Sequence, residues 1–266
     1  MNHIRDFKRL MVNERLPLNL LRHGGNFGYC PICQRRTLFF CQGSFRRDQY
    51  RCCRCKSIPR WRAIVYILET HFPNWRELTM HESSPGGASS DKFARECKHY
   101  IGTQYFPDVP PGQSKNGIRC EDLENLTFAN ESVDLVVTQD VFEHIPDAGR
   151  AFAEIARTLK PGGAHVFTVP WFYWKDTLLR AVRENGTMRH LEKPDYHGNP
   201  IDAKGSLVIR EWGWDLIDFI YEHSRLATTA IRLCDRTRGL EGQFLEVFIC
   251  RKPGGKVAGG DASACK

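Results

Sequence analysis

Apolar runs and amphipathic stretches alternate along the chain from residue 78 onward. The runs at 78–82, 99–105, 132–138 and 164–169 predict strands, whereas 91–97 and 147–159 predict helices. Strands that alternate with helices form a parallel sheet, because each helix carries the chain back across one face of the sheet. The pattern therefore predicts an α/β fold with a doubly wound, mostly parallel sheet. In such sheets, ligands bind beyond the carboxyl ends of the strands.

Local signals predict where two of the helices begin and end. Ser57 is expected to cap a helix that has Pro59 in its first turn, where the missing amide costs nothing. The apolar residues of this helix recur at helical spacing: Trp61, Ile64, Val65, Leu68 and Phe72. Asp147 is expected to cap the second helix, and Pro161-Gly162-Gly163 to end it before the strand at 164–169.

A long segment without clear periodicity, residues 170–205, interrupts this alternation. A connection of this length is usually functional or disordered, and its Trp, Tyr and His residues favour an ordered lid. The alternation resumes with a helix at 214–223 and strands at 227–233 and 243–251. From residue 253 the glycine-rich, lysine-ended segment predicts a disordered tail.

The first 57 residues do not follow the alternation of the main domain. Residues 1–28 predict a short helical lead that ends at Gly24-Gly25-Asn26, and a cysteine-rich module follows at 29–57. The predicted organisation is therefore a lead and module at 1–57, a main domain at 58–252 with its lid insertion at about 170–205, and a tail at 253–266.

Charge is distributed unevenly along the chain. The net charge is +7, yet residues 1–75 hold 14 Lys and Arg against 4 Asp and Glu, a net of +10, which leaves −3 for the rest. A basic front end is typical either of a surface for nucleic acid or of a solvated basic face. No run approaches the roughly 20 apolar residues that span a bilayer, and the N-terminus has no apolar core of a signal peptide. We expect a cytoplasmic protein without a membrane partner.

Six of the 11 cysteines lie between Cys30 and Cys55, and four of them form two C-x2-C pairs. Each pair offers two thiolates from one tight turn, so that Cys30, Cys33, Cys52 and Cys55 together predict a closed, tetrahedral, structural Zn²⁺ site. Such a site has no open position and hence no catalytic role. Cys41 and Cys53 are expected to be spare, although either one is an alternative ligand.

The stretch HESSPGGASS, residues 81–90, places an acidic residue at a strand end before small residues and a helix start. Small side chains leave backbone amides open to a ligand, which is typical of a cofactor loop. Ser84 and Ala88 stand where a nucleotide-binding fingerprint would have glycines, so the loop alone is equally compatible with a simple turn.

Three segments in order, HESSPGG, CEDLENLTFANESVDLVVTQDVFEHIPDAGRAF and EIARTLKPGGAHVFTVP, resemble the class I S-adenosylmethionine-dependent methyltransferases. The resemblance covers about residues 78–170 and is strongest to the bacterial group related to the ubiquinone-biosynthesis type. It implies a seven-stranded, Rossmann-like sheet and S-adenosylmethionine as the cofactor.

The resemblance also implies a cofactor site in this sequence. Glu82 takes the place of the acid that ends the first strand, and Ser84, Pro85, Gly86 and Gly87 form the loop under the methionine part. Asp122 and the amide of Leu123 match the position that binds adenine, which needs an acceptor for its amino group. The acid that usually holds the ribose hydroxyls is here Gln104, an amide without charge, which predicts weaker cofactor binding.

Candidate catalytic residues follow the fourth and fifth strands. Asp140 matches the position that lines the reactive end of the cofactor. His144 is suited to act as a general base, or alternatively Glu143 and His144 only hydrogen-bond their loop. In the insertion, Tyr196 and His197 are candidates to orient an acceptor, with His197 as a catalytic partner, under aromatic walls from residues 170–174.

Three functions are compatible with these features. The leading interpretation is methyl transfer, by in-line displacement, to a small molecule or a sugar-type metabolite or glycan, with the zinc module helping to cover the cleft. The second is an RNA methyltransferase that docks through the basic module. The third is a non-catalytic, zinc-stabilised binding protein. The basic residues available for RNA are Arg35, Arg36, Arg46, Arg47, Arg51, Arg54, Lys56, Arg60 and Arg62.

Overall fold

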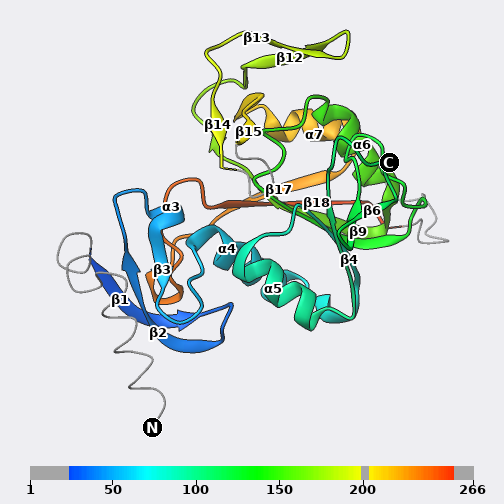
Figure 1. The fold of residues 1–266 in the computed structure, drawn as a ribbon. Coiled ribbons are helices and arrows are strands. Elements are labelled where there is room, and N and C mark those ends of the chain that lie inside the picture. The colour runs from blue at the N-terminus through cyan, green and yellow to red at the C-terminus, as the bar shows by residue number, and fades with distance from the viewer. Residues whose placement is uncertain (1–23, 199–203, 255–266) are drawn as a thin grey trace, which may run out of the picture.

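The computed structural model describes residues 24–198 and 204–254, and its centre is an eight-stranded sheet (Figure 1). The strand order is β17-β18-β9-β8-β4-β5-β7-β6. The strands are β4 (Thr79–Ser83), β5 (His99–Gln104), β6 (Ser114–Lys115), β7 (Ile118–Cys120), β8 (Val133–Gln139), β9 (Leu159–Thr168), β17 (Ala227–Arg232) and β18 (Glu246–Arg251). The five strands from β9 to β7 are parallel to one another, and β6, β18 and β17 run antiparallel to their neighbours. The predicted α/β, mostly parallel fold is confirmed, and the short hairpin strand β6 makes eight strands instead of seven.

Helices cover both faces of this sheet. One face packs against α4 (Pro59–His71) and α5 (Gly87–Glu96), where Ile64, Leu68 and Phe93 form a core with side chains of β4, β8 and β9. The opposite face packs against α6 (Ala148–Thr158) and α7 (Leu216–Ser224), where Phe152 and Ile220 join the second core. Figure 1 shows the two pairs of helices on opposite sides of the strands.

The helix-end signals are confirmed at one helix and wrong at another. The Asp147 carboxylate accepts a hydrogen bond from the amide of Arg150 at 3.0 Å and so caps α6. The residue that caps α4 is Ile58, which has no polar side chain, with Pro59 in the first turn as predicted. Ser57 does not cap α4, because its hydroxyl lies among cysteine thiols instead.

The boundary between α6 and β9 also differs from the prediction. The helix ends at Thr158, and the strand begins at the next residue, so that Pro161-Gly162-Gly163 lies inside β9. Gly162 has a φ of +80°, and the pairing of β8 with β9 shifts register between Val133 and Leu135. The turn residues therefore form a bulge within the strand.

The cysteine module is a three-stranded antiparallel sheet with one short helix. It consists of β1 (Gly25–Cys30), β2 (Arg35–Cys41), α3 (Arg46–Gln49) and β3 (Tyr50–Cys52). The predicted helical lead at 1–28 is wrong for residues 25–28, which belong to β1, and residues 1–23 of that prediction lie outside the described residues.

The module packs against α4 and the segment at 236–239 of the main domain. Asn26 donates to the carbonyl of Arg236 at 2.7 Å, in the short helix η2 (Arg236–Arg238), and a side chain at Gly28 would overlap the carbonyl of Thr237. The fully buried Arg62 of α4 donates to the carbonyl of Gly239 at 2.7 Å and to that of Tyr50 at 2.8 Å. One arginine thus connects the module, α4 and the C-terminal segment.

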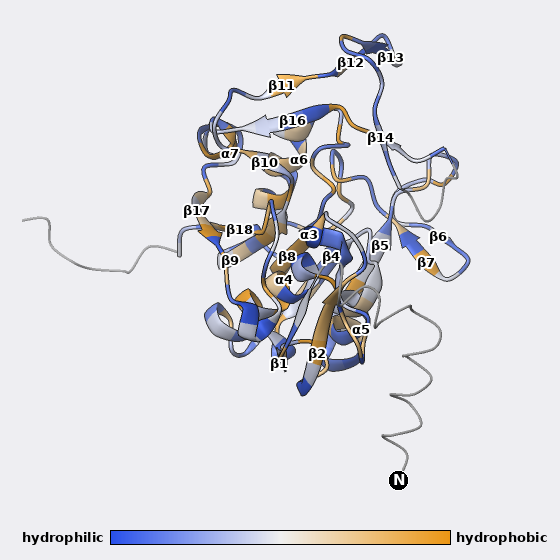
Figure 2. Ribbon diagram, turned by 90° about the vertical axis from the view of Figure 1, so that its left-hand side faces the viewer, coloured by the Kyte–Doolittle hydropathy of each residue, from blue (hydrophilic) through white to orange (hydrophobic). Residues whose placement is uncertain are grey.

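The insertion after β9 forms small β-structures above the sheet. They are β10 (Trp171–Phe172), β11 (Leu178–Leu179), β12 (Ala181–Glu184), β13 (Thr187–His190), β14 (Tyr196–His197), β15 (Ser206–Leu207) and β16 (Arg210–Gly213). The β12–β13 hairpin is largely hydrophilic (Figure 2). Residues 255–266 of the predicted tail lie outside the described residues. In the described part of the chain, every helix is too short or too polar to cross a membrane.

Candidate functional site

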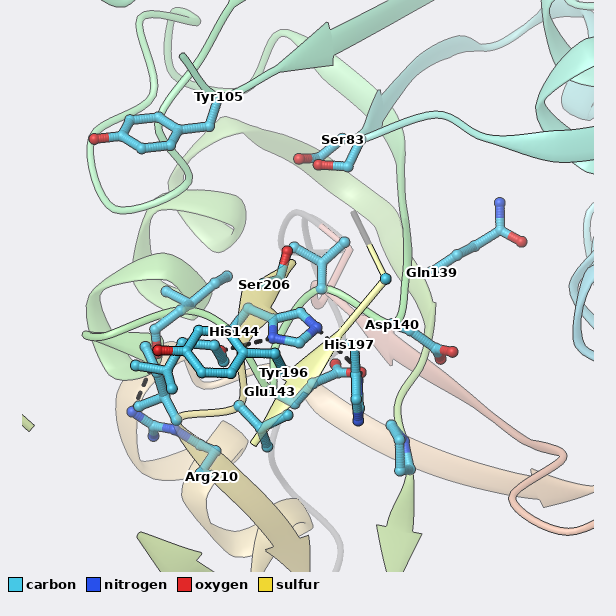
Figure 3. A pocket seen from close by; sticks show the side chains of 18 of the residues that line it. Ser83, Tyr105, Gln139, Asp140, Glu143, His144, Tyr196, His197, Ser206 and Arg210 are labelled. Carbon is cyan, nitrogen blue, oxygen red and sulfur yellow. Dashed lines mark hydrogen bonds and ion pairs between the residues drawn. The ribbon is translucent and has the colours of Figure 1, made fainter. Parts of the chain in front are cut away.

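A cavity of about 1270 Å³ opens at the carboxyl ends of β4, β5 and β8 (Figure 3). The loops after these strands form one wall, the insertion forms a second, and α3 with the start of α4 forms a third. The cavity is lined by these residues predicted to bind the cofactor or act in catalysis: Ser84, Gly86, Gly87, Gln104, Asp122, Leu123, Asp140, His144 and His197. The predicted residues therefore meet in one place, with Glu82 as the exception.

Glu82 lies beneath the cavity and is 1% exposed. Its carboxylate accepts hydrogen bonds from Ser90 at 2.7 Å, from Gln139 at 2.8 Å and from Tyr100 at 2.7 Å. Burial raises its pKa even though these three bonds favour the charged form. In this structure Glu82 links α5, the start of β5 and the end of β8 instead of lining the cavity.

The loop after β4 approaches the cavity with little side-chain cover. Gly86 precedes α5 in extended backbone, and a side chain there would meet no atom within 4 Å, so that its surroundings are open. Gly87 has a φ of +77°, and a side chain there would overlap the indole of Trp61. Glycine is required at 87 for two reasons, whereas at 86 its effect is to leave space for a ligand.

Gln104 and Asp122 line the cavity after β5 and β7. One carboxylate oxygen of Asp122 accepts from the amide of Glu124 at 2.9 Å, which fixes the turn that follows. Burial raises the pKa of Asp122. Leu123 is 6% exposed and presents its backbone at the same turn.

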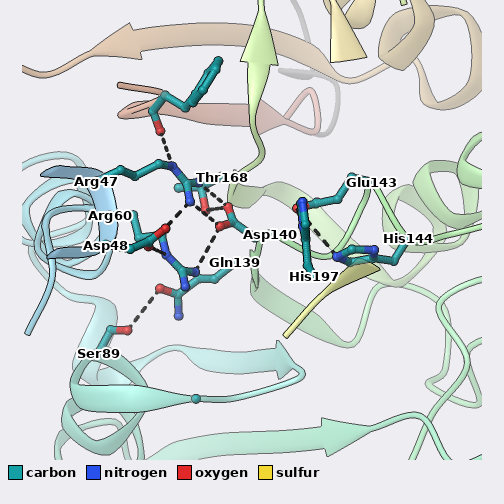
Figure 4. Close-up of polar contacts among 12 residues, drawn as sticks. Arg47, Asp48, Arg60, Ser89, Gln139, Asp140, Glu143, His144, Thr168 and His197 are labelled. Carbon is teal, nitrogen blue, oxygen red and sulfur yellow. Dashed lines mark hydrogen bonds and ion pairs between the residues drawn. The ribbon is translucent and has the colours of Figure 1, made fainter. Parts of the chain in front are cut away.

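Asp140 is held by two arginines from outside the main sheet (Figure 4). Arg47 of α3 donates to its two oxygens at 2.6 and 2.7 Å, and Arg60 lies 3.1 Å from it. Thr168 of β9 donates at 3.0 Å. Burial alone would raise the pKa of Asp140, but the charges of Arg47 and Arg60 outweigh it and hold the pKa well below its usual range. The residue has a φ of +54°, a strained conformation that these contacts maintain.

Glu143, His144 and His197 gather at the opposite end of the cavity from the glycine loop (Figure 3). His144 Nε2 and His197 Nδ1 each lie 3.8 Å from Glu143 Oε1, and the two imidazole rings meet edge to face at 5.2 Å. Burial, with the charge of Asp140, raises the pKa of Glu143 to about 8, and burial lowers the pKa of His144 to about 4. At pH 7 His144 is therefore neutral and a poor proton acceptor.

Four cysteines of the module lie close together, away from the cavity. Their sulfur atoms are all within 4.8 Å of one another, with Cys30 and Cys55 at 3.7 Å and Cys33 and Cys52 at 4.0 Å. Ser57 contacts the thiols of Cys30 and Cys55 at 3.5 and 3.1 Å. The spare cysteines, Cys41 and Cys53, are not in this group.

Several site residues were not predicted from the sequence. Arg47, Arg60 and Trp61 belong to the module and α4, and no local pattern indicates that they line the cavity. Arg47, for example, contacts Asp140, 93 residues later. Glu143 was considered only as a loop residue. The one available signal was its position next to His144, directly after the fourth predicted strand.

Several of the basic residues proposed for RNA contact have partners inside the protein. Arg47 and Arg60 bind Asp140, Arg62 is fully buried, and Arg46 pairs with Glu241. Only part of the positive charge counted in the sequence is therefore available at the surface.

Comparison with known proteins finds similarity in the central part of the chain. A family model described as "Methyltransferase domain" matches residues 83–167. A dimethylglycine N-methyltransferase of Parasynechococcus marenigrum (strain WH8102) is 47% identical over 97 residues, which are 36% of this chain and 31% of that protein. An uncharacterized methyltransferase of Mycobacterium sp. (strain JLS) is 29% identical over 109 residues, 35% of this chain and 42% of that protein. The chain thus spans less than half the length of these two curated relatives.

Solved structures match a larger share of the chain at low identity. An S-adenosylmethionine dependent methyltransferase from Mesorhizobium loti has a TM-score of 0.47 and 16% identity, covering 71% of this chain and 98% of that one. A putative methyltransferase in complex with the Haloferax volcanii Trm112 activator has a TM-score of 0.48 and 15% identity, covering 74% and 91%. The family match at 83–167 spans the loops after β4, β5 and β8, which form one wall of the cavity. Residues 83–167 thus match a methyltransferase domain, and the sheet around them has a doubly wound, Rossmann-like fold.

Proposed function

We propose that the protein transfers the methyl group of S-adenosylmethionine to a small-molecule acceptor. The observation that carries the proposal is the single cavity that joins the glycine loop and Asp122 to the group formed by Glu143, His144 and His197. One end has the open backbone that a cofactor needs, and the other has polar side chains that suit an acceptor.

The cofactor is proposed to lie along the ends of β4, β5 and β7. Ser84, Gly86 and Gly87 face its methionine part, Gln104 its ribose, and Asp122 with the amide of Leu123 its adenine. The open space beside Gly86 supports this placement. Asp140 shapes the wall between cofactor and acceptor, and its ion pair with Arg47 makes it a fixed carboxylate instead of a proton acceptor.

Methyl transfer from a sulfonium requires little acid or base chemistry from the protein. The acceptor must be held about 3 to 3.5 Å from the methyl carbon and in line with the bond to sulfur. Tyr196 and His197 of β14 and the loop after β8 line the far end of the cavity and are proposed to position the acceptor. The Parasynechococcus relative is named for a small acceptor, which supports the class of acceptor but not its identity.

We further propose that the four-cysteine group holds a structural Zn²⁺ ion. Zinc at about 2.3 Å from four sulfurs in a tetrahedron separates them by about 3.8 Å. The distances of 3.7 and 4.0 Å fit this requirement, and the Ser57 hydroxyl is in place to support two of the ligands. The ion would hold the turns on either side of α3, and so hold Arg47 against Asp140.

Cofactor binding is tested by calorimetric titration of the full chain with S-adenosylhomocysteine. We expect saturable binding, and we expect Asp122→Ala to weaken it at least about tenfold, because an adenine contact is lost. Asp108→Ala removes an exposed carboxylate outside the cavity and serves as the matched control. No binding at millimolar ligand would favour the non-catalytic alternative, in which Ser84 and Ala88 have replaced the glycines of a former cofactor loop.

The RNA-methyltransferase alternative has weaker support. Arg46, Arg47, Arg60 and Arg62 are engaged within the protein, which reduces the basic surface that the sequence suggested. RNA binding whose affinity falls steeply as the salt concentration rises would support the RNA-methyltransferase alternative.

A further inference from the structure

Glu143 is a buried carboxylate for which the structure supplies no hydrogen-bond donor. The residue is 2% exposed, and neither carboxylate oxygen has a hydrogen-bond partner among the described residues. The backbone carbonyl of Glu143 accepts from the amides of Ile209 and Arg210 at 2.8 and 3.2 Å, so the residue is fixed in place. A fixed, buried carboxylate without a donor is costly unless another group binds it.

The groups nearest to this carboxylate are two imidazole nitrogens. His144 Nδ1 lies 2.8 Å from the carbonyl of Leu207, and because a carbonyl only accepts, Nδ1 carries the proton. Nε2 of His144 therefore carries a lone pair, and this nitrogen lies 3.8 Å from Glu143 Oε1. Nδ1 of His197 lies 3.8 Å from the same oxygen (Figure 4). These distances are too long for hydrogen bonds.

Asp140 is not available to this group. Both of its oxygens are taken by Arg47, and Arg60 and Thr168 add further contacts. The arginines neutralise one acid of the loop and leave the other, Glu143, without a cation.

We propose that Glu143, His144 and His197 bind a divalent metal ion. A carboxylate and two neutral imidazoles suit ions such as Mn²⁺, Fe²⁺ or Zn²⁺. Ligand atoms around a tetrahedral ion are separated by about 3.4 Å, so the two distances of 3.8 Å to Glu143 need a shift of a few tenths of an ångström. The two imidazole nitrogens lie within 4.8 Å of each other and must also approach. His197 belongs to a two-residue strand of the insertion and its side chain is 43% exposed, so it is free to make this shift. The hydrogen bond from His144 to Leu207 orients that ligand, as is usual at metal sites.

Three protein ligands leave positions open toward the cavity, which defines a class of acceptor. This step rests on the proposed methyltransferase activity. An acceptor hydroxyl bound to the ion loses its proton more readily, since the ion stabilises the resulting oxyanion. The oxyanion attacks the methyl carbon, an oxygen–carbon bond forms, and the carbon–sulfur bond breaks. Neutral S-adenosylhomocysteine leaves, and the proton passes to solvent. The acceptor is thus expected to be a hydroxyl compound.

The site is tested with Mn²⁺, measured by electron paramagnetic resonance on the full, zinc-loaded chain. The four-thiolate group disfavours Mn²⁺, so this probe reports the second site alone. We expect about one Mn²⁺ bound per chain. Glu143→Gln preserves the shape of the side chain, and His197→Asn changes an exposed residue; each is expected to weaken Mn²⁺ binding more than about tenfold. His190→Asn, also in the insertion and exposed, is the matched control and should bind Mn²⁺ as the unaltered chain does.

The proposal is overturned if the unaltered chain binds no Mn²⁺, or if Glu143→Gln and His197→Asn bind it as well as the control does. Titration with S-adenosylhomocysteine on the same samples separates this result from the proposed function. If the cofactor binds but Mn²⁺ does not, only the proposed metal site is rejected. If Mn²⁺ binding depends on Glu143 but the cofactor does not bind, the metal site is supported and the proposed methyltransferase activity is rejected.

Discussion

Arg47 and Asp140 lie 93 residues apart in the chain and form a two-point ion pair, with nitrogen–oxygen distances of 2.6 and 2.7 Å. Arg47 comes from the cysteine module, and Asp140 from the loop after β8. The side chain of Arg47 is 4% exposed, and its Nε also donates to the carbonyl of Phe244 at 3.0 Å. The module thus supplies part of the wall of the cavity.

Replacement of Arg47 with Met is expected to lower the free energy of unfolding by about 3 kcal/mol, because Asp140 loses its main counter-charge while remaining largely buried. Urea unfolding measures the change. Adding Asp140→Asn to this variant should recover part of the loss, since the unpaired charge is removed.

The neighbouring Arg46 provides the control for this experiment. It pairs with Glu241 at a more exposed position, with side chains that are 32% and 26% exposed. Arg46→Met should therefore cost less than about 1 kcal/mol. Equal losses for the two variants would contradict a special role of the pair between Arg47 and Asp140.

Removal of the proposed zinc ion should weaken cofactor binding as well as the module itself. Cys52→Ser is expected to reduce the zinc content measured by elemental analysis and to weaken S-adenosylhomocysteine binding, because α3 would no longer hold Arg47 in place. Cys41→Ala, which alters a buried cysteine outside the four-cysteine group, should retain the zinc. Zinc content that is unaffected by Cys52→Ser would refute the assignment.

Adjacent glycines in the loop after β4 should respond differently to substitution. Gly87→Ala is expected to destabilise the protein by at least about 1 kcal/mol, because the backbone has a φ of +77° and the new methyl group would overlap Trp61. Gly86→Ala should leave stability nearly unchanged yet weaken cofactor binding, since its methyl group enters the open space. Thermal unfolding and calorimetric titration of both variants distinguish these effects. Unchanged cofactor affinity in Gly86→Ala would place the cofactor elsewhere.

Each buried histidine with a lowered pKa should make the fold less stable as the pH drops below about 6.5, the usual pKa of histidine in an unfolded chain. Glu143, with its pKa raised to about 8, acts in the opposite direction between about pH 8 and pH 4.5. His81 and His165 are fully buried in the sheet, and burial lowers the pKa of each to about 3. His81 contacts Thr103 and Phe128, and His165 contacts Thr138; the charge of Arg119 lowers the pKa of His81 further. Because only the unfolded chain takes up protons between these values, each histidine reduces stability by about 1.4 kcal/mol per pH unit.

Urea unfolding at pH 7 and pH 5 tests this pH dependence. His165→Gln should show a smaller loss between the two pH values than the unaltered chain, since the contribution of one buried histidine is gone. His190→Asn changes an exposed histidine and serves as the control. A loss in His165→Gln as large as in the control would contradict the explanation.

Most of the parallel sheet could be predicted from the sequence because β4, β5, β8 and the end of β9 are local apolar runs, whereas the short strands β6 and β7 are not. The run at 132–138 has Val133, Leu135, Val136 and Val137, all of which are buried in β8. The cap at Asp147 was equally local. The prediction that Ser57 caps α4 was wrong, although its position in the sequence suits a cap. Its hydroxyl contacts Cys30, Cys55 and Arg62, which come together only in the folded module.

The candidate site was only partly predictable for the same physical reason. The resemblance to the methyltransferases grouped Gly86, Gln104 and Asp122, and the fold brings them together because loops after parallel strands meet at one sheet edge. The contact of Arg47 with Asp140 depends on how two separate units pack together, and no periodicity encodes that packing. Among the many arginines of the basic front end, nothing in the sequence distinguishes Arg47 from its neighbours.

The contacts of Asn26 and Arg62 with residues 236–239 determine when the protein can mature during synthesis. The module leaves the ribosome early, but its docking surface is translated more than 170 residues later. Until then Asn26 and Arg62 lack their contacts with residues 236–239, and Arg47, which neutralises Asp140, is not yet anchored by the carbonyl of Phe244. The wall that α3 contributes is therefore completed late in folding, and a nascent chain released before residue 244 would lack the Phe244 contact that anchors Arg47.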